Sequence, residues 1–316
     1  MKKIRLLLDM SVTEESAGIL FALDHVKEQV EVLGISLCFG RVSLESSRRS
    51  MGGLLELLGW NTEVALGAER PWRRDYMLPV SDEDVGQAIN GLQIDTDRTW
   101  PVVSGEDGAD FIYRKLSEQG GGKILCAGCL TNLAMLLERY PDAGELIEEI
   151  IWCGGTWRHA QLQMVKDYGT FLDLEAAQYV LERKIPLTMC PVDAGEICYL
   201  TKEEVDIHMY EKEPVLHQFN RLMKKRWCDA NAELPLGQRR RPLPLQDMAA
   251  VAAAVAPELC GREMRYGEVD LEGRLTFGML VIDINNRLNH RPEEMNIGQL
   301  VQIDREKAIR KFYMDK

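Results

Sequence analysis

The 316-residue chain contains 46% hydrophobic residues, which is enough to bury a large core and excludes an intrinsically disordered protein. Its formal net charge of −12 repels a phosphate backbone and argues against nucleic acid as a partner. The apolar stretch after Lys2 and Lys3 is too short for a signal peptide, and nowhere do about eighteen apolar residues run together, so we expect a cytoplasmic protein with no membrane partner.

Short apolar runs alternate with amphipathic segments as far as residue 190, a pattern typical of repeated β-α-β units. The expected strands cover residues 4–8, 30–37, 63–66, 123–126, 149–152 and 186–189. The expected helices cover residues 17–27, 44–58, 109–118, 132–139 and 174–182. Apolar strands with helices between them predict an α/β fold with a doubly wound, mostly parallel sheet.

The rest of the chain is expected to be mainly helical. Residues 202–226 are charged and amphipathic with helical spacing, and three prolines within residues 234–245 predict a loop. A further helix is expected at residues 247–255, and residues 268–271 and 276–283 form a hairpin-like pair joined by Glu272-Gly273. Because no tandem repeat or low-complexity linker separates these segments, we expect one domain over residues 1–316.

The eight cysteines lie mostly in apolar, strand-like contexts and are expected to be buried free thiols. Cys126 and Cys129 have CxxC spacing, but no second CxxC or HxxxH pair accompanies them. The spacing therefore disfavours a zinc or redox site.

Candidate site residues follow the strands, because ligands of open α/β sheets bind beyond the carboxyl ends of the strands. The first strand leads into an acidic loop that contains Asp9, Ser11, Glu14 and Glu15. Ser11 and Glu14 have the spacing of a helix capping box, which is a structural explanation of Glu14. Asp247 begins an alanine-rich helix, where the helix dipole alone favours a carboxylate.

Taken in order, these segments resemble the nucleoside hydrolase family over most of the chain. The family's opening motif, DTDPGxDDA, is similar to residues 9–17, and its LTNxA motif is similar to residues 130–134. Its GAxxP, MGG, DPEAA and TxGxTVVD motifs are similar to residues 67–71, 153–155, 173–177 and 276–283. The resemblance implies a single domain of the nucleoside hydrolase type with a helical C-terminal part.

The resemblance also implies a function, an N-glycosidase that hydrolyses the N-glycosidic bond of a ribonucleoside or a related riboside. In the family, one Ca²⁺ is held by aspartates of the opening loop, a threonine carbonyl and a late aspartate, and presents water to the anomeric carbon. The implied catalytic residues are Asp9, Glu15 and Asp247. The implied metal positions are Ser11, Ser16, Thr131 and Asp247. The implied substrate-binding residues are Arg41, Asn90, Cys153, Gln161, Asp167 and Gln246.

The opening loop departs from the family pattern. Ser11 stands where the family has the aspartate that binds metal and acts as base, and Ser16 stands at the bidentate ligand. Glu15 replaces the ribose-binding aspartate. Since Ca²⁺ affinity depends on how many ligands carry charge, these changes weaken the implied calcium site. A one-residue slip would align Glu14 and Glu15 with the paired aspartates, but it displaces Ala17 and needs a deletion in a tight loop.

Two functions stay open from the sequence. The first is an enzyme that acts on a riboside, for which Arg41 at the pocket rim suggests an anionic substituent on the substrate. The second is a catalytically inactive relative that binds a nucleoside or a sugar without turnover. Family members are commonly dimers or tetramers, so the resemblance implies a homo-oligomer whose other partner is a small molecule.

Overall fold

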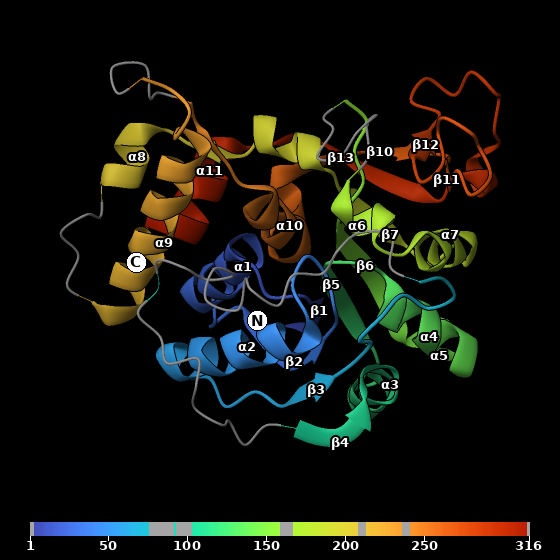
Figure 1. The fold of residues 1–316 in the computed structure, drawn as a ribbon, viewed down its shortest axis with the longest axis horizontal. Coiled ribbons are helices and arrows are strands. Elements are labelled where there is room, and N and C mark those ends of the chain that lie inside the picture. Colours follow the sequence, from blue (N-terminus) through green and yellow to red (C-terminus); the bar gives the residue numbers. More distant parts are fainter. Residues whose placement is uncertain are drawn as a thin grey trace.

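A computed structural model describes residues 3–75, 92, 103–158, 167–207, 213–235 and 241–314. Its centre is a nine-stranded sheet (Figure 1). From one edge to the other the strands are β10 (Cys260–Arg265), β13 (Ile297–Ile303), β7 (Leu187–Cys190), β6 (Ile147–Cys153), β5 (Gly122–Ala127), β1 (Ile4–Met10), β2 (Val30–Leu37), β3 (Val64–Leu66) and β4 (Val103–Asp107). Neighbouring strands pair in parallel except β10 with β13, which confirms the predicted mostly parallel α/β sheet.

The strand order fixes where a ligand can bind. From β1 the chain moves outward through β2, β3 and β4, then returns to the other side of β1 and continues through β5, β6 and β7. The connections therefore diverge between β1 and β5, and such a switch point opens a crevice at the carboxyl ends of the strands. Asp9, near the end of β1, is level with Ser36 of β2 and Cys126 of β5.

Helices cover both faces of this sheet and define two hydrophobic cores. One core includes residues of α1 (Glu14–His25), α2 (Leu44–Leu58), α9 (Pro214–Ala230), α10 (Gln246–Val255) and α11 (Arg305–Ile309). The other includes residues of α3 (Gly108–Gln119), α4 (Thr131–Arg139), α5 (Ala143–Leu146) and α7 (Leu174–Glu182). This arrangement is the predicted doubly wound fold (Figure 1).

Helix α10 lies against the middle of the sheet because its side chains are small. Every residue from Asp247 to Val255 is buried, and five of them are alanines. A helix that is apolar on all sides must be enclosed, and α10 packs between α1 and strands β5, β6 and β7. Its first residues, Gln246 and Asp247, therefore point to the strand ends at the switch point.

The predicted start of the first helix was wrong. Thr13 is the N-cap of α1, and its hydroxyl accepts the N–H of Ser16 at 3.3 Å while the Ser16 hydroxyl accepts the N–H of Thr13 at 2.8 Å. The capping box is thus Thr13 with Ser16, not Ser11 with Glu14. Ser11 cannot cap the helix because its N–H still bonds to the carbonyl of Ala127 at the end of β5.

The expected helical segment at residues 202–226 is two helices, α8 (Lys202–Asp206) and α9. Pro214 starts α9 with its fixed φ angle, and Glu213 caps it by accepting the N–H of Leu216. The expected hairpin is present with shorter strands, β11 (Gly267–Val269) and β12 (Leu280–Ile282), outside the main sheet. Two further strands, β8 (Tyr199–Leu200) and β9 (Leu243–Pro244), pair with each other.

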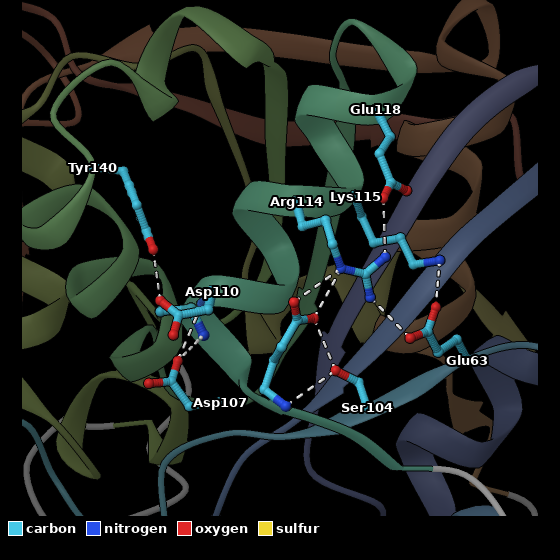
Figure 2. Close-up of polar contacts among 10 residues, drawn as sticks. Glu63, Ser104, Asp107, Asp110, Arg114, Lys115, Glu118 and Tyr140 are labelled. Atoms are coloured by element: carbon cyan, nitrogen blue, oxygen red, sulfur yellow. Dashed lines mark hydrogen bonds and ion pairs between the residues drawn. The ribbon is translucent and has the colours of Figure 1, made fainter.

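Sequence periodicity missed the two edge strands, β4 and β10, and also β13 beside β10. Charges hold β4 in place where apolar alternation is absent (Figure 2). Arg114 of α3 bonds to Glu63 before β3, to Glu106 of β4 and to Glu118 of its own helix. A pattern of apolar runs does not indicate such a network, since its residues are charged and partly exposed.

All eight cysteines are free thiols, as predicted, and only Cys228 is exposed. Within the described residues, no helix combines the length and the apolar character that a membrane crossing needs.

Candidate functional site

A pocket opens at the carboxyl edge of the sheet, at the switch point. Its cavity volume is about 110 Å³, and the pocket is partly open to solvent. Strand ends supply part of its lining: Ser11, Gly40, Arg41, Ala127, Gly128, Cys153, Gly154 and Val192. Helix starts supply another part: Glu15, Ser16, Asp167, Gln246 and Asp247. Eight of the residues predicted from the sequence therefore meet in one cavity: Ser11, Glu15, Ser16, Arg41, Cys153, Asp167, Gln246 and Asp247.

Glu15 brings a fixed negative charge to the pocket. It lies in the first turn of α1, and its Oε2 accepts a hydrogen bond from Arg41 at 2.5 Å. Partial desolvation at the pocket wall raises the pKa of the Glu15 carboxyl, but the guanidinium groups of Arg41 and Arg226 outweigh this effect and lower the pKa to about 2. Arg41 in turn lies 5.4 Å from the ring centroid of Tyr168, which also lines the pocket. Glu15 is therefore ionised at any physiological pH.

The two serines that replace family aspartates are engaged with the loop itself. The Ser16 hydroxyl donates to the carbonyl oxygen of Ser11 at 2.7 Å. The Ser11 side chain lies against Gly40, where an added Cβ would be 2.2 Å from the Ser11 Oγ. Only glycine lets the end of β2 approach Ser11 this closely. Neither serine supplies the charge of a carboxylate.

Asp9 lies beneath the pocket and is not among the residues that line it. The side chain is fully buried, with Oδ1 accepting from Asn132 at 2.7 Å and Oδ2 contacting the Cys126 thiol at 3.6 Å. Burial raises the pKa of Asp9 to about 6, although these hydrogen bonds oppose the shift. The catalytic role of Asp9 stays a prediction, and the structure shows its carboxyl bracing β1 through Asn132.

The side chain of Thr131 is engaged within the fold, while the metal-ligand role of its carbonyl, which the resemblance implies, stays a prediction. Thr131 is the first residue of α4, is fully buried, and does not line the pocket. Its hydroxyl donates to Oδ2 of Asp173 at 2.6 Å, and Trp72 donates its N–H to the same oxygen at 2.7 Å. Thr131 thus joins α4 to the start of α7.

Asn132, whose role the sequence did not indicate, is the hub beneath the pocket. Its Oδ1 accepts the N–H of Ala68, and its Nδ2 donates to Asp9, to the Ser36 hydroxyl and to the carbonyl of Leu37. One amide thereby fixes the ends of β1, β2 and β3. The similarity of residues 130–134 to the LTNxA motif was the available signal.

Arg226 is the second residue that sequence reasoning missed. Its guanidinium reaches from α9 to the start of α10, with Nη1 3.0 Å from Oδ2 of Asp247 and Nη2 3.4 Å from Oδ1. Burial lowers the pKa of Arg226, but the carboxylates of Asp247 and Glu15 outweigh burial and raise it. The available signal was a charge on the apolar face of α9, seven residues after Phe219.

Asp167 and Gln246 lie on other sides of the pocket. Oδ2 of Asp167 accepts the N–H groups of Gly155 at 2.8 Å and Thr170 at 2.9 Å, which anchors the start of α6 (Tyr168–Phe171). Burial raises the pKa of Asp167 despite these bonds. Gln246 uses one N–H of its amide on the carbonyl of Cys190 at 2.7 Å. Asn90 and Gln161, the other two expected substrate-binding residues, lie outside the described residues.

The donors at this site do not fit Ca²⁺. Calcium needs six to eight oxygens and draws affinity from charged ligands. Here Ser11 and Ser16 are uncharged, and the carboxylate of Asp247 is already held by Arg226. Among the described residues, no group of three His, Cys, Asp or Glu side chains is arranged to hold a metal ion.

Known proteins match this chain over nearly its whole length. An uncharacterized protein of Schizosaccharomyces pombe is 27% identical over 272 residues, which cover 84% of this chain and 80% of that protein. The non-specific ribonucleoside hydrolase RihC of Salmonella typhimurium is 24% identical over 300 residues, or 92% and 90% of the two chains.

Solved structures show the same fold. A plant nucleoside hydrolase has a TM-score of 0.84 at 18% identity, covering 99% of this chain and 98% of its own. The purine-preferring ribonucleoside hydrolase from Gardnerella vaginalis has a TM-score of 0.81 at 22% identity, covering 98% and 97%. The family model described as inosine-uridine preferring nucleoside hydrolase matches residues 8–310. The chain belongs to the inosine-uridine preferring nucleoside hydrolase family.

Proposed function

We propose that this protein binds a ribonucleoside or a related riboside in the pocket and hydrolyses its N-glycosidic bond. The observation that carries the proposal is the ionised carboxylate of Glu15 at the pocket, at the position where the family binds ribose. Carboxylate oxygens accept hydrogen bonds from sugar hydroxyls. A negative charge beside the ribose also stabilises an oxocarbenium-like transition state.

The reaction breaks the bond between the anomeric carbon and the base nitrogen. The electron pair leaves with the base, the oxygen of water bonds to the anomeric carbon, and the base gains a proton. In an oxocarbenium-like transition state the leaving bond is largely broken, so stabilisation of positive charge at the ring dominates the barrier. We assign that role to Glu15, and we propose that Asp167 and Gln246, which also line the pocket, contact the sugar and the base.

A second function, binding without turnover, is favoured by one specific observation. Ser11 replaces the family's base, and the Ser16 hydroxyl donates its hydrogen bond to the Ser11 carbonyl oxygen. A hydroxyl does not take a proton from water near neutral pH as a carboxylate does. A protein with this loop can hold a riboside and release it unchanged.

One experiment separates the two functions. Purified protein is incubated with a panel of purine and pyrimidine ribonucleosides, and free ribose is measured by a reducing-sugar assay while binding is measured by calorimetry. Ribose release that is lost in Glu15→Gln supports hydrolysis. Binding without release supports the second function, and the absence of both contradicts the pocket as a riboside site. The cytoplasmic location and the homo-oligomeric state remain predictions.

A further inference from the structure

We propose that the guanidinium of Arg226 is the resident cation of this site, and that it takes the place that Ca²⁺ has in the nucleoside hydrolase family. The inference concerns the same pocket as the proposed function. Its test measures cation binding and stability rather than ribose release, so a failure of this inference can be told from a failure of the proposed function.

The first support is the way Arg226 is placed. Phe219, Met223 and Arg226 follow each other at helical spacing on the buried face of α9. Phe219 stacks on Phe21 of α1, with ring centroids 5.0 Å apart, which fixes α9 against α1. The chain therefore carries a full charge at a position where the pattern calls for an apolar residue. A guanidinium is buried in this way only where carboxylates compensate it.

The second support is that Arg226 engages the late aspartate that the family uses as a metal ligand. Both carboxylate oxygens of Asp247 face the two terminal nitrogens of the guanidinium, at 3.0 and 3.4 Å. The two side chains are 6% and 5% exposed. A planar guanidinium matches a carboxylate through two parallel contacts, so both oxygens of Asp247 face a positive charge that repels a metal ion.

The third support is the charge balance at the start of α1. Glu15 is paired with Arg41 at 2.5 Å, and Asp247 is paired with Arg226 at 3.0 Å. Glu14, one residue before Glu15, is paired with Lys225 at 2.7 Å. Each of these three carboxylates therefore faces a cation, and Lys225 is shared between Glu14 and Asp229. A divalent ion would have to displace one of them, whereas a Ca²⁺ site normally offers uncompensated negative charge.

The fourth support is the close packing of helix α1 against the Arg226–Asp247 pair. Gly18 of α1 faces this pair, and an added Cβ would lie 2.2 Å from Oδ2 of Asp247 and 3.3 Å from Nη1 of Arg226. The helix thus approaches as closely as its backbone allows. Helix α1 packs against both α9 and α10 (Figure 1). The guanidinium reaches the start of α10 through its ion pair with Asp247.

The direct test is a Ca²⁺ titration of chelator-treated protein. We expect no binding heat and no change in melting temperature up to about 10 mM Ca²⁺, above the dissociation constants of the weakest natural calcium sites. Micromolar or millimolar binding that is lost in Asp247→Asn would overturn the proposal. The titration itself uses the unaltered chain, and the Asp247→Asn variant is needed only to assign a binding signal to this site.

A rescue experiment tests the role of the guanidinium itself. The Arg226→Ala variant has a vacant cation position beside Asp247, and we expect its melting temperature to be lower than that of the unaltered protein. Guanidinium ion at about 10 mM, far below denaturing concentrations, should reverse part of this decrease. The matched control is Arg226→Ala with Asp247→Ala, where the free ion has no carboxylate to bind. Equal responses of the two variants, or no response of a folded Arg226→Ala protein, would contradict the proposal.

A gain of function completes the test. The double variant Ser11→Asp with Ser16→Asp restores the family's loop charges but retains Arg226. The triple variant adds Arg226→Met to these two changes. We expect the double variant to bind Ca²⁺ at least tenfold more weakly than the triple variant, a difference of about 1.4 kcal/mol. Equal Ca²⁺ affinity of the two proteins would show that Arg226 does not occupy the cation position.

Discussion

Arg226 and Asp247 come from different helices, yet the Nη1 and Oδ2 atoms lie 3.0 Å apart in the core. Removing either partner leaves a buried charge without compensation, so the pair holds α9 and α10 in register with the strand ends. The pocket above it depends on that register, because Asp247 and its neighbour Gln246 both line the cavity.

A double-mutant cycle measures this coupling. We expect Asp247→Asn alone to lower the free energy of unfolding by about 3 kcal/mol, because the guanidinium stays buried without its carboxylate. The variant with both Asp247→Asn and Arg226→Met should lose less than the sum of the single variants. Urea denaturation provides the four free energies, and strict additivity would contradict the pairing.

Gly18→Ala should destabilise the protein although alanine is the better helix former. The new Cβ would lie 2.2 Å from Oδ2 of Asp247, so the pair or the helix must move. We expect a loss of about 2 kcal/mol in the free energy of unfolding. The control is Gly144→Ala in α5, where the nearest atom to an added Cβ is at an ordinary 3.6 Å. A stabilised Gly18→Ala protein would show that the contact is not tight.

Glu15→Gln should weaken riboside binding without unfolding the protein. Glu15 is 53% exposed, so its loss costs little stability, but the neutral amide accepts weaker hydrogen bonds from ribose hydroxyls. We expect affinity to fall about tenfold, measured by calorimetry. The matched control is Glu45→Gln, an exposed glutamate with its own arginine, Arg48, at 2.6 Å. Equal affinities for Glu15→Gln and the unaltered protein would remove Glu15 from the site.

Glu149 should give the protein a pH-dependent stability. It bonds to Lys123 at 2.8 Å, to Thr188 at 2.6 Å and to Arg262, so it ties β6 to three other strands. Burial raises the pKa of Glu149, but the hydrogen bonds from Lys123 and Thr188 outweigh burial and lower it. A carboxyl group whose pKa is lower in the folded state than in the unfolded state stabilises the fold at pH values above the unfolded-state pKa. This stabilisation is lost as the pH falls through the folded-state pKa.

We therefore expect Glu149→Gln to cost about 2 kcal/mol at pH 7, and the difference from the unaltered protein to narrow as the pH falls below about 4. Denaturant titrations across this pH range measure it. A difference that stays constant with pH would mean that the charge of Glu149 contributes nothing.

The sequence predicted the sheet core and eight of the residues that line the pocket, because apolar runs mark β1, β2, β5, β6 and β7 and their carboxyl ends must converge. It did not indicate that the side chains of Asp9 and Thr131 are buried outside the pocket lining, since a motif position does not reveal whether a side chain faces the ligand or the core. It missed β4, which partly exposed charges such as Arg114 secure. It missed Arg226 because the partner, Asp247, is 21 residues away and meets it only through tertiary packing.

The most direct test of a metal-independent riboside hydrolase compares ribonucleoside cleavage in excess chelator with cleavage in added Ca²⁺, with free base measured by chromatography. The account predicts the same rate in both conditions and a loss of that rate in Glu15→Gln. Cleavage that appears only when Ca²⁺ is present, or no cleavage of any ribonucleoside in either condition, would contradict it.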